Sequence, residues 1–348
     1  MALLTAKEIL KVKLTGNYEK DRAFLISESE KMMAEGNREG ANAAAELVFE
    51  IMPDSEKKKI ENYVYINGKR LDTYYNELRA LIKENKKDEA REMAKALYEK
   101  IISVYQEDEK SKFVSLRNKF EENVYQFLLK PEKVLQIAPF DFVSMISTYG
   151  YLLVDCHDFD EAIKVLNKAM EYNEIDCGAK FELAEAYKLM GKNDELLAIT
   201  KETLKVASSP YAISRCYCNL GFYCFNIGDF DSAAVFYYSS LLFAPHPAVE
   251  MELRNIAQRT HKELKPPTEA DIDRVFKKYD VQRGPNEVLV SIAAQLANNA
   301  LENNDTTEAL LYLKILFGLT NDPEIEKIIL KYEPDAKEKA KARFGIED

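Results

Sequence analysis

Small or apolar residues recur in pairs along the chain, with twelve positions separating the two members of a pair. The aligned pairs are Gly150 and Ala162, Ala184 and Leu196, Gly221 and Ala233, and Ala297 and Ala309. Between the two members lies a short turn with an acidic residue, such as Gly228-Asp229. This spacing predicts two helices joined by a turn, repeated about every 34 residues, which is typical of an α-solenoid.

The other apolar positions also follow a helical period. Glycine and proline are scarce, with 12 and 11 among 348 residues, and no alternating apolar run bounded by turn residues is found. The predicted fold class is therefore all-α, without strands. Regular copies of the repeat are expected at about 143–176, 177–210, 214–247 and 290–323.

The regularity of the copies predicts three regions. Residues 1–130 are expected to form an irregular N-terminal helical region with degenerate helix pairs, because turns at Gly36 and Asn85 keep the same interval to an alanine. Residues 143–264 hold the regular repeats, and 265–348 a linker helix, a last repeat and C-terminal capping helices. Helices outside the regular copies are predicted at 74–83, 89–105, 111–129, 248–264, 324–332 and 335–343. Thr268 and Asp271 have the spacing of a capping box.

The pair at Gly221 and Ala233 illustrates the expected packing. Both residues have almost no side chain, so two helices can approach closely there, and Leu220, Phe236, Tyr237 and Leu241 are predicted to fill the surrounding space. Each large apolar side chain that is fully buried contributes about 1.5–3 kcal/mol. One pair cannot bury enough apolar surface, so neighbouring pairs must stack.

The charge is unevenly distributed. Residues 1–130 contain 24 basic and 24 acidic residues, so the whole formal charge of −11 falls after position 130. Because an acidic surface repels phosphate backbones and anionic lipid, nucleic acid and membrane are not expected as partners. Basic peptides would be attracted, although a solvated acidic surface is the simpler interpretation.

Targeting signals and thiols point to the cytoplasm. Residues 1–13 include Lys7, Glu8 and Lys11 and lack a secretory signal pattern, and no apolar run approaches the roughly 20 residues of a membrane helix. The five cysteines are an odd number in a large chain, which favours reduced thiols.

No catalytic or cofactor motif is found, so the chain is not expected to be an enzyme or to need a cofactor or metal. Gly-rich nucleotide loops, the paired-histidine zinc motif and the serine nucleophile elbow are absent from the sequence. His157 replaces a turn glycine, while His246 and His261 are expected at the surface. Cys216 and Cys218 are two apart on a predicted helix, which points them to different faces, so small buried thiols are the better interpretation.

Several copies resemble the tetratricopeptide repeat family, whose pattern is W-x2-L-G-x2-Y, A-x3-F and P over about 34 residues. Leu183-Ala184-x2-Tyr187 and Leu220-Gly221-x2-Cys224 match the first half, and Ala162-x3-Leu166 and Ala233-x3-Tyr237 match the second. Departures are the lack of tryptophan and the presence of Leu196 and Thr200 where small and aromatic residues are usual. The match covers 143–323 with a gap near 248–289.

The resemblance implies a right-handed superhelical α-solenoid whose first helices line a concave groove. It implies a non-catalytic scaffold that binds a protein or peptide there, with aromatic pockets and a cation that fixes a carboxylate. The groove residues predicted in this way are Tyr151, Asp155, Phe181, Glu185, Lys188, Arg215, Phe222 and Phe225, together with Ser147 and Cys218. Some of these aromatic residues are equally compatible with packing against a neighbouring copy.

Alternative functions remain open. Bacterial relatives of this architecture use the groove as a receptor for short signalling peptides and often carry an N-terminal helix-turn-helix or an effector-binding helical bundle. Residues 1–130 are compatible with such a bundle, but their zero net charge disfavours DNA reading. A chaperone co-factor is disfavoured because Arg215, Asn219 and Lys188 lack the further cations of that subset. A homodimer formed through an apolar groove or an imperfectly capped end is also compatible with the sequence.

Overall fold

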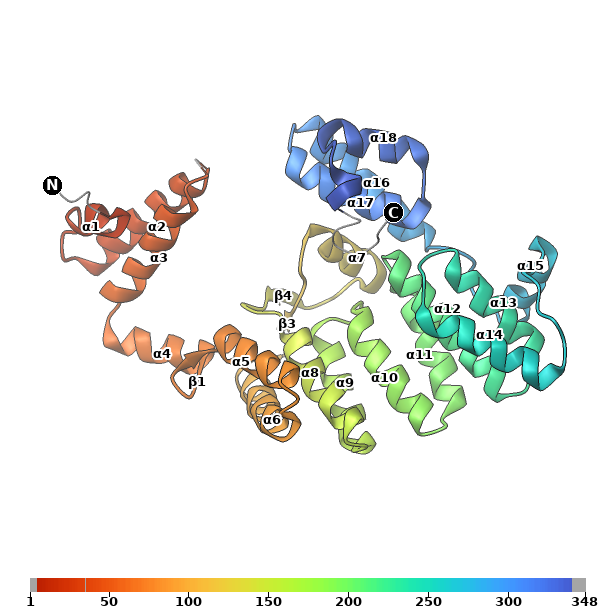
Figure 1. Ribbon diagram of the computed structural model, residues 1–348. Helices are drawn as coiled ribbons and strands as arrows, with labels where there is room; N and C mark the ends of the chain where they lie inside the picture. Colours follow the sequence, from red (N-terminus) through yellow and green to blue (C-terminus); the bar gives the residue numbers. More distant parts are fainter. Residues whose placement is uncertain (1–4, 35, 340–348) are drawn as a thin grey trace. The chain divides into compact units, whose positions relative to one another are not determined.

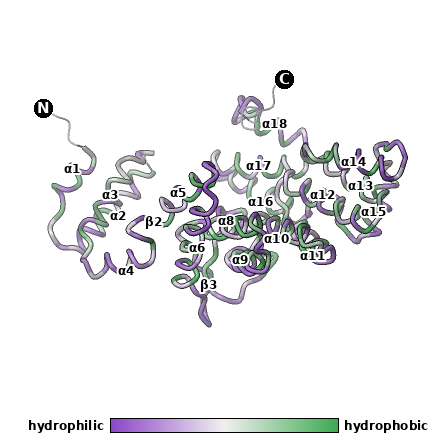
Figure 2. The backbone as a smooth tube through the Cα atoms, turned by 60° about the horizontal axis from the view of Figure 1, so that its bottom comes forward, coloured by the Kyte–Doolittle hydropathy of each residue, from purple (hydrophilic) through white to green (hydrophobic). Residues whose placement is uncertain are grey.

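The computed structural model describes residues 5–34 and 36–339, and most of them lie in helices (Figure 1). The coarse prediction of a predominantly helical chain is confirmed. Green and purple stretches alternate along individual helices in Figure 2, as expected for helices with one apolar face. Within the described residues, no helix is both long and apolar enough to cross a bilayer.

Internal contacts divide the chain into two compact units, residues 1–77 and 78–348. The division falls inside helix α5 (Leu71–Lys83). The predicted boundary near residue 130 lies within the second unit, where it stays a prediction.

The first unit is a small helical bundle with a short hairpin. Leu10, Leu25, Ala44 and Leu47 form its core. The antiparallel strands are joined by Asn67 and Gly68, both at positive φ, the backbone that this two-residue turn requires. Its elements are α1 (Ala6–Lys11), α2 (Tyr18–Ala34), α3 (Arg38–Ile51), α4 (Asp54–Val64), β1 (Tyr65–Ile66) and β2 (Lys69–Arg70).

The second unit contains the predicted repeats. Each of the four predicted ranges holds two consecutive helices that pack against each other: α8 with α9, α10 with α11, α12 with α13, and α16 with α17. These helices are α8 (Phe142–Asp155), α9 (Phe159–Tyr172), α10 (Cys177–Leu189), α11 (Asn193–Val206), α12 (Pro210–Asn226), α13 (Phe230–Leu241), α16 (Glu287–Glu302) and α17 (Thr306–Thr320). In Figure 1, α8 to α13 follow one another in a row.

The turns inside the pairs share one backbone geometry. In each turn a single residue adopts the left-handed conformation, with φ between 58° and 81°: Gly36, Asn85, His157, Gly191, Gly228 and Asn304. The following N–H donates to the carbonyl five residues earlier, as from Asp229 to Cys224 at 2.9 Å and from Lys192 to Tyr187 at 2.9 Å. This is the Schellman arrangement that ends a helix, and it explains why glycine or asparagine recurs at the turn. His157 occupies the glycine place, as predicted.

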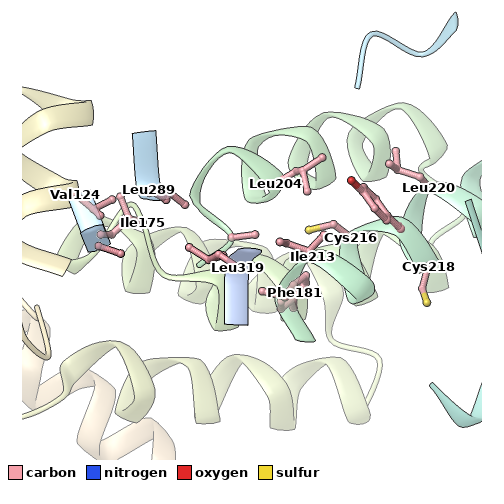
Figure 3. Close-up of a cluster of buried hydrophobic side chains, with 14 of the residues drawn as sticks. Val124, Ile175, Phe181, Leu204, Ile213, Cys216, Cys218, Leu220, Leu289 and Leu319 are labelled. Carbon is pink, nitrogen blue, oxygen red and sulfur yellow. The ribbon is translucent and has the colours of Figure 1, made fainter. Parts of the chain in front are cut away.

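The close approach at Gly221 is also present. A Cβ built on Gly221 would lie 2.9 Å from the Tyr237 ring, so a larger residue cannot fit without movement. Leu220, Phe236 and Tyr237 are buried around this contact, whereas Leu241 is 44% exposed. The prediction that Leu241 helps to fill this space is therefore wrong, because it lies on the outer side of α13. Figure 3 shows part of the apolar core, with residues from several helices converging.

The prediction of a strand-free chain is wrong in both units. In the second, β3 (Ser111–Val114) and β4 (Val134–Ile137) form a parallel pair, so the helix predicted at 111–129 begins only at α7 (Lys119–Leu129). Asn118 accepts from the N–H of Glu121 and starts α7. Val114 is fully buried, and Phe113 packs edge-on against Tyr105, which favours the extended backbone here.

Further helices are α6 (Lys87–Val104), α14 (Pro247–Thr260), α15 (Glu269–Lys278) and α18 (Pro323–Tyr332), and residues 336–339 are helical as well. The capping box predicted at Thr268 is present, since Thr268 and Asp271 bond reciprocally. Phe276 of α15 packs against Tyr217 and Phe236. Part of the last predicted helix, 340–343 of 335–343, lies outside the described residues.

The last helix pair packs against earlier parts of the second unit. α16 contacts α7, and Asn286 at its start donates to the carbonyl of Lys205 at 2.8 Å. A Cβ on Gly318 of α17 would lie 3.2 Å from Pro210. The segment between α14 and α16, which contains α15, therefore returns the chain so that the pair α16–α17 lies beside the starts of α7 and α12.

Candidate functional site: a pocket between α10, α12 and α14

A pocket of about 380 Å³ lies where α10, α12 and α14 meet. Residues of α10 and α12 supply its charged and aromatic groups, α13 contributes Tyr237, and α14 with the residue before it closes the third side. The lining consists of Glu185, Lys188, Tyr211, Arg215, Cys218, Asn219, Phe222, Tyr237, His246, Ala248, Val249 and Glu252.

Helical spacing explains why these residues share one surface. Arg215, Asn219 and Phe222 are separated by four and three positions, so they lie along one face of α12. Glu185 and Lys188 are three apart on α10 and are likewise neighbours. Four of the eight predicted groove residues therefore line one pocket: Glu185, Lys188, Arg215 and Phe222.

The two cations of the pocket are held by carboxylates and aromatic rings. Lys188 Nζ lies 3.2 Å from Glu185 Oε2 and 5.4 Å from the centre of the Phe222 ring. The Arg215 guanidinium lies 4.5 Å from the Phe181 ring centre, and its Nη2 is 3.9 Å from Glu182 Oε1. These contacts fix the positions of both cations while leaving them at the pocket wall.

Two polar atoms of the pocket have no hydrogen-bond partner among the described residues. They are Asn219 Oδ1 and His246 Nδ1, and Asn219 is only 2% exposed. Burial lowers the pKa of His246, and the nearby charges of Lys188 and Arg215 lower it further, which favours the neutral imidazole. The pocket thus contains buried polar groups whose hydrogen-bonding capacity is unused.

The other four predicted groove residues lie elsewhere. Tyr151 is 40% exposed on α8, and Asp155 forms an ion pair with Lys87 Nζ at 2.8 Å. Phe181 is 4% exposed, covered in part by Arg215, and so belongs to the core. Phe225 packs edge-on against Phe230 and lies under Arg259. None of these four lines the pocket between α10, α12 and α14.

Sequence reasoning missed the contribution of α14 and of the segment before it. His246 was expected at the surface, but its Nδ1 is buried and it lines the pocket. Val249 and Glu252 are three apart, which places them on the α14 face that meets the pocket. That spacing is the signal in the sequence that could have identified them.

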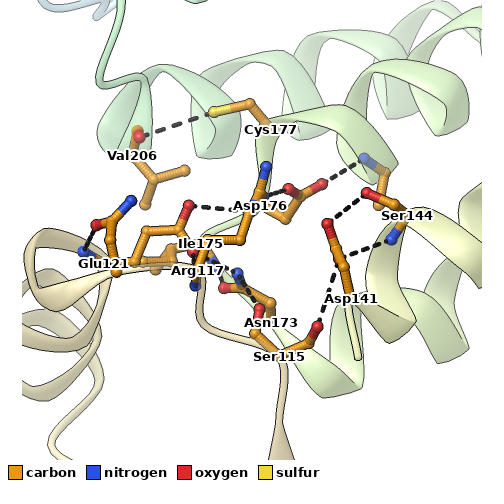
Figure 4. A network of polar contacts seen from close by, with 12 residues as sticks. Ser115, Arg117, Glu121, Asp141, Ser144, Asn173, Ile175, Asp176, Cys177 and Val206 are labelled. Atoms are coloured by element: carbon orange, nitrogen blue, oxygen red, sulfur yellow. Dashed lines mark hydrogen bonds and ion pairs between the residues drawn. The ribbon is translucent and has the colours of Figure 1, made fainter. Parts of the chain in front are cut away.

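A second pocket of about 280 Å³ lies beside the starts of α8, α10 and α12. Arg117 pairs with Asp176 and, at 3.1 Å, with Glu121, while Asn173 donates to the carbonyl of Ser115 at 3.1 Å (Figure 4). Asp176 also accepts from the N–H of Ala179 at 2.8 Å. Ser147, predicted for the groove, lines this second pocket. These contacts anchor the segment before α7 to the repeat helices.

Cysteine and metal chemistry do not define a further site. All five cysteines are free thiols, and burial raises the pKa of Cys177 and of Cys224 to about 12. In the part of the chain that the structure describes, no group of three or more His, Cys, Asp or Glu side chains is placed to hold a metal ion.

The pocket between α10, α12 and α14 therefore has charged groups, aromatic rings and unpaired polar atoms with which it can hold a ligand. No protein-family model matches the chain, and no curated protein sequence matches it.

Proposed function

We propose that this chain is a non-catalytic, cytoplasmic binding protein that takes a segment of a protein or peptide into the pocket between α10, α12 and α14. In this proposal the helix pairs are degenerate tetratricopeptide-type repeats of a right-handed α-solenoid. The first helices of successive repeats, α10 and α12, then present their inner faces to the ligand, and α14 extends that surface.

The pocket itself carries the proposal. Its walls combine Phe222 and Tyr211 with Lys188 and Arg215, a mixture that suits an apolar side chain beside a polar group. Its volume, about 380 Å³, is enough for one or two side chains of a bound segment. Specificity would therefore reside in a few ligand residues, and the remaining contacts would lie outside the pocket.

A selection experiment tests this function directly. Purified full-length protein is used to select binders from a displayed library of random peptides, and the selected peptides are measured by isothermal titration calorimetry. We expect peptides that bind the parent and lose about tenfold or more in affinity with Phe222→Ala.

Phe225→Ala is the matched control. Phe225 is an aromatic residue on the same helix, but it packs against Phe230 and Arg259 outside the pocket. We expect this variant to bind the selected peptides as the parent does. Equal losses with both variants, or selected peptides insensitive to Phe222→Ala, would place binding away from the pocket and contradict the proposal.

The division of the chain favours one alternative, a peptide-sensing regulator. Residues 1–77 form a compact unit with its own apolar core, as an effector region would require. Hydrogen exchange measured with and without a selected peptide tests this alternative. A regulator should change exchange within residues 1–77 when the peptide binds, whereas a scaffold should change it only around the pocket.

A further inference from the structure

The pocket contains a hydrogen-bond acceptor that the protein itself leaves unused. Asn219 is 2% exposed, and its Oδ1 has no partner among the described residues. Leaving a buried amide oxygen unpaired costs about 1–3 kcal/mol. A ligand that brings a donor to this atom recovers that cost, so Asn219 selects for a ligand that carries a donor.

His246 imposes a second requirement. Its Nδ1 is buried in the same pocket and also lacks a partner among the described residues. A neutral imidazole nitrogen is either a donor or an acceptor, depending on the tautomer. A ligand group that carries both a donor and an acceptor can satisfy this nitrogen in either form.

Charge narrows the choice of ligand group. Lys188 and Arg215 line the pocket together with Glu185 and Glu252, so the two positive and two negative charges balance and favour a ligand group without net charge. A carboxylate would be attracted to these cations, but it carries only acceptors and would leave the Asn219 oxygen facing another lone pair. A primary carboxamide offers two N–H donors to the buried acceptors and an oxygen to the cations, without net charge.

We propose that this pocket recognises a primary carboxamide, carried by a glutamine or asparagine side chain of the bound segment, with Asn219 as the residue that determines this specificity. The inference rests on the proposed function and goes beyond it by naming the ligand group. The aliphatic stem of such a side chain would contact Phe222 and Val249, which line the pocket.

A main-chain amide has similar hydrogen-bonding groups, but the cost of burying further polar groups favours a side chain. A main-chain unit reaching Asn219 would carry its neighbouring N–H and C=O groups into the pocket, where each needs a partner of its own. A side-chain carboxamide ends its chain and brings no further polar group.

The test uses four blocked peptides that differ at one position. They are acetyl-Ala-Ala-Xaa-Ala-Ala N-methylamides with glutamine, glutamate, lysine or methionine at Xaa, titrated into full-length protein and followed by NMR. Blocking both ends removes every other primary carboxamide and terminal charge. We expect the glutamine peptide to bind about tenfold or more tightly than the other three.

Variants then assign the preference to Asn219. Asn219→Leu keeps the number and branching of side-chain heavy atoms while removing both polar atoms, and it should abolish the preference for glutamine over methionine. Ser239→Ala is the matched control, because Ser239 also has a buried oxygen without a partner among the described residues but does not line the pocket. It should leave the preference intact, and thermal melts establish that both variants are folded.

Other outcomes overturn the inference. Equal binding of all four peptides, weakened equally by Asn219→Leu, would indicate main-chain recognition. Tightest binding of the glutamate peptide would assign the pocket to carboxylates. If none of the four peptides binds while the binding of library peptides still depends on Phe222, the carboxamide inference fails and the proposed function stands. If the binding of library peptides is also unaffected by Phe222→Ala, both the inference and the proposed function fail.

Discussion

Gly221 of α12 lies directly against the ring of Tyr237 of α13, with 2.9 Å between a Cβ built on Gly221 and Cδ1 of the ring. Tyr237 is 2% exposed and so has little room to move. Gly150 faces Leu166 in the same way in the pair α8–α9, where a Cβ would also clash. The absence of a side chain at these positions sets how closely the two helices of a pair approach.

Substitution of Gly221 tests this contact. Gly221→Ala is expected to destabilise the protein by about 1–3 kcal/mol in urea unfolding, and Gly221→Leu by more, because the ring of Tyr237 must move. In a double-mutant cycle, Gly221→Ala combined with Tyr237→Leu should cost less than the sum of the single changes. Additive losses would show that the two residues do not oppose each other.

This contact is also the part of the fold that could be predicted from the sequence. Small residues twelve apart and a turn residue between them are local features, and they identified the four pairs of the second unit. The turn needs a left-handed residue, which glycine and asparagine adopt at low cost, so the residue type itself marks the place. Asn67-Gly68 is a comparable signal for the β1–β2 hairpin that went unrecognised.

The missing elements depend on contacts distant in sequence. Val114 pairs with Ile137 in the parallel strands, across the whole of α7, and no local pattern reveals that pairing. Likewise, the role of Asn219 depends on His246 and α14 closing the pocket over it. The repeat register implied by the family resemblance predicted Glu185, Lys188, Arg215 and Phe222, which line one pocket, but it could not distinguish Phe181, which Arg215 covers.

Stability at acid pH is predicted to depend on Asp229. Its carboxylate accepts from Lys278 at 2.6 Å and from the Tyr279 hydroxyl, and these bonds outweigh burial and lower the pKa of Asp229 to about 2. Because the folded pKa lies below the unfolded value of 3.8, the contribution is complete above about pH 4 and disappears as the pH falls through about 2.

Urea unfolding of the parent and of Asp229→Asn at a series of pH values measures this contribution. The variant should be less stable by about 1–2 kcal/mol near neutral pH, with the difference shrinking between about pH 4 and pH 2. Asp231→Asn is the matched control, since it removes a carboxylate from the same helix start while Lys278 and Tyr279 keep their partner. Parallel profiles for the parent and Asp229→Asn would contradict the assignment.

The ion pairs of Arg117 are predicted to hold the segment before α7 in place. Asp176 is 7% exposed at its side chain, so removing Arg117 leaves a buried carboxylate without its partner. Arg117 itself is 43% exposed, which reduces the expected cost of Arg117→Leu to about 1–3 kcal/mol in urea unfolding. Lys164→Ala, which breaks the exposed pair with Glu161, should cost less than about 1 kcal/mol. Similar small losses for both variants would refute a structural role for Arg117.

Thiol labelling tests the packing around the pocket. Cys156 is exposed, whereas Cys216, Cys218 and Cys224 are 0%, 8% and 0% exposed and Cys177 is half-buried. Since the thiolate is the reactive form, burial that raises the pKa of Cys177 and Cys224 to about 12 also slows their alkylation. Mass spectrometry after brief iodoacetamide treatment should therefore find one modified cysteine in the folded protein and five after unfolding in guanidinium. Cys156→Ser should remove the fast modification.

Cys218 lines the pocket, so its labelling also reports on whether solvent enters the pocket. Modification of Cys218 at the rate of Cys156 would mean that the pocket opens to solvent. Asn219, the next residue, would then have water as its hydrogen-bond partner and would lose its selectivity for the ligand.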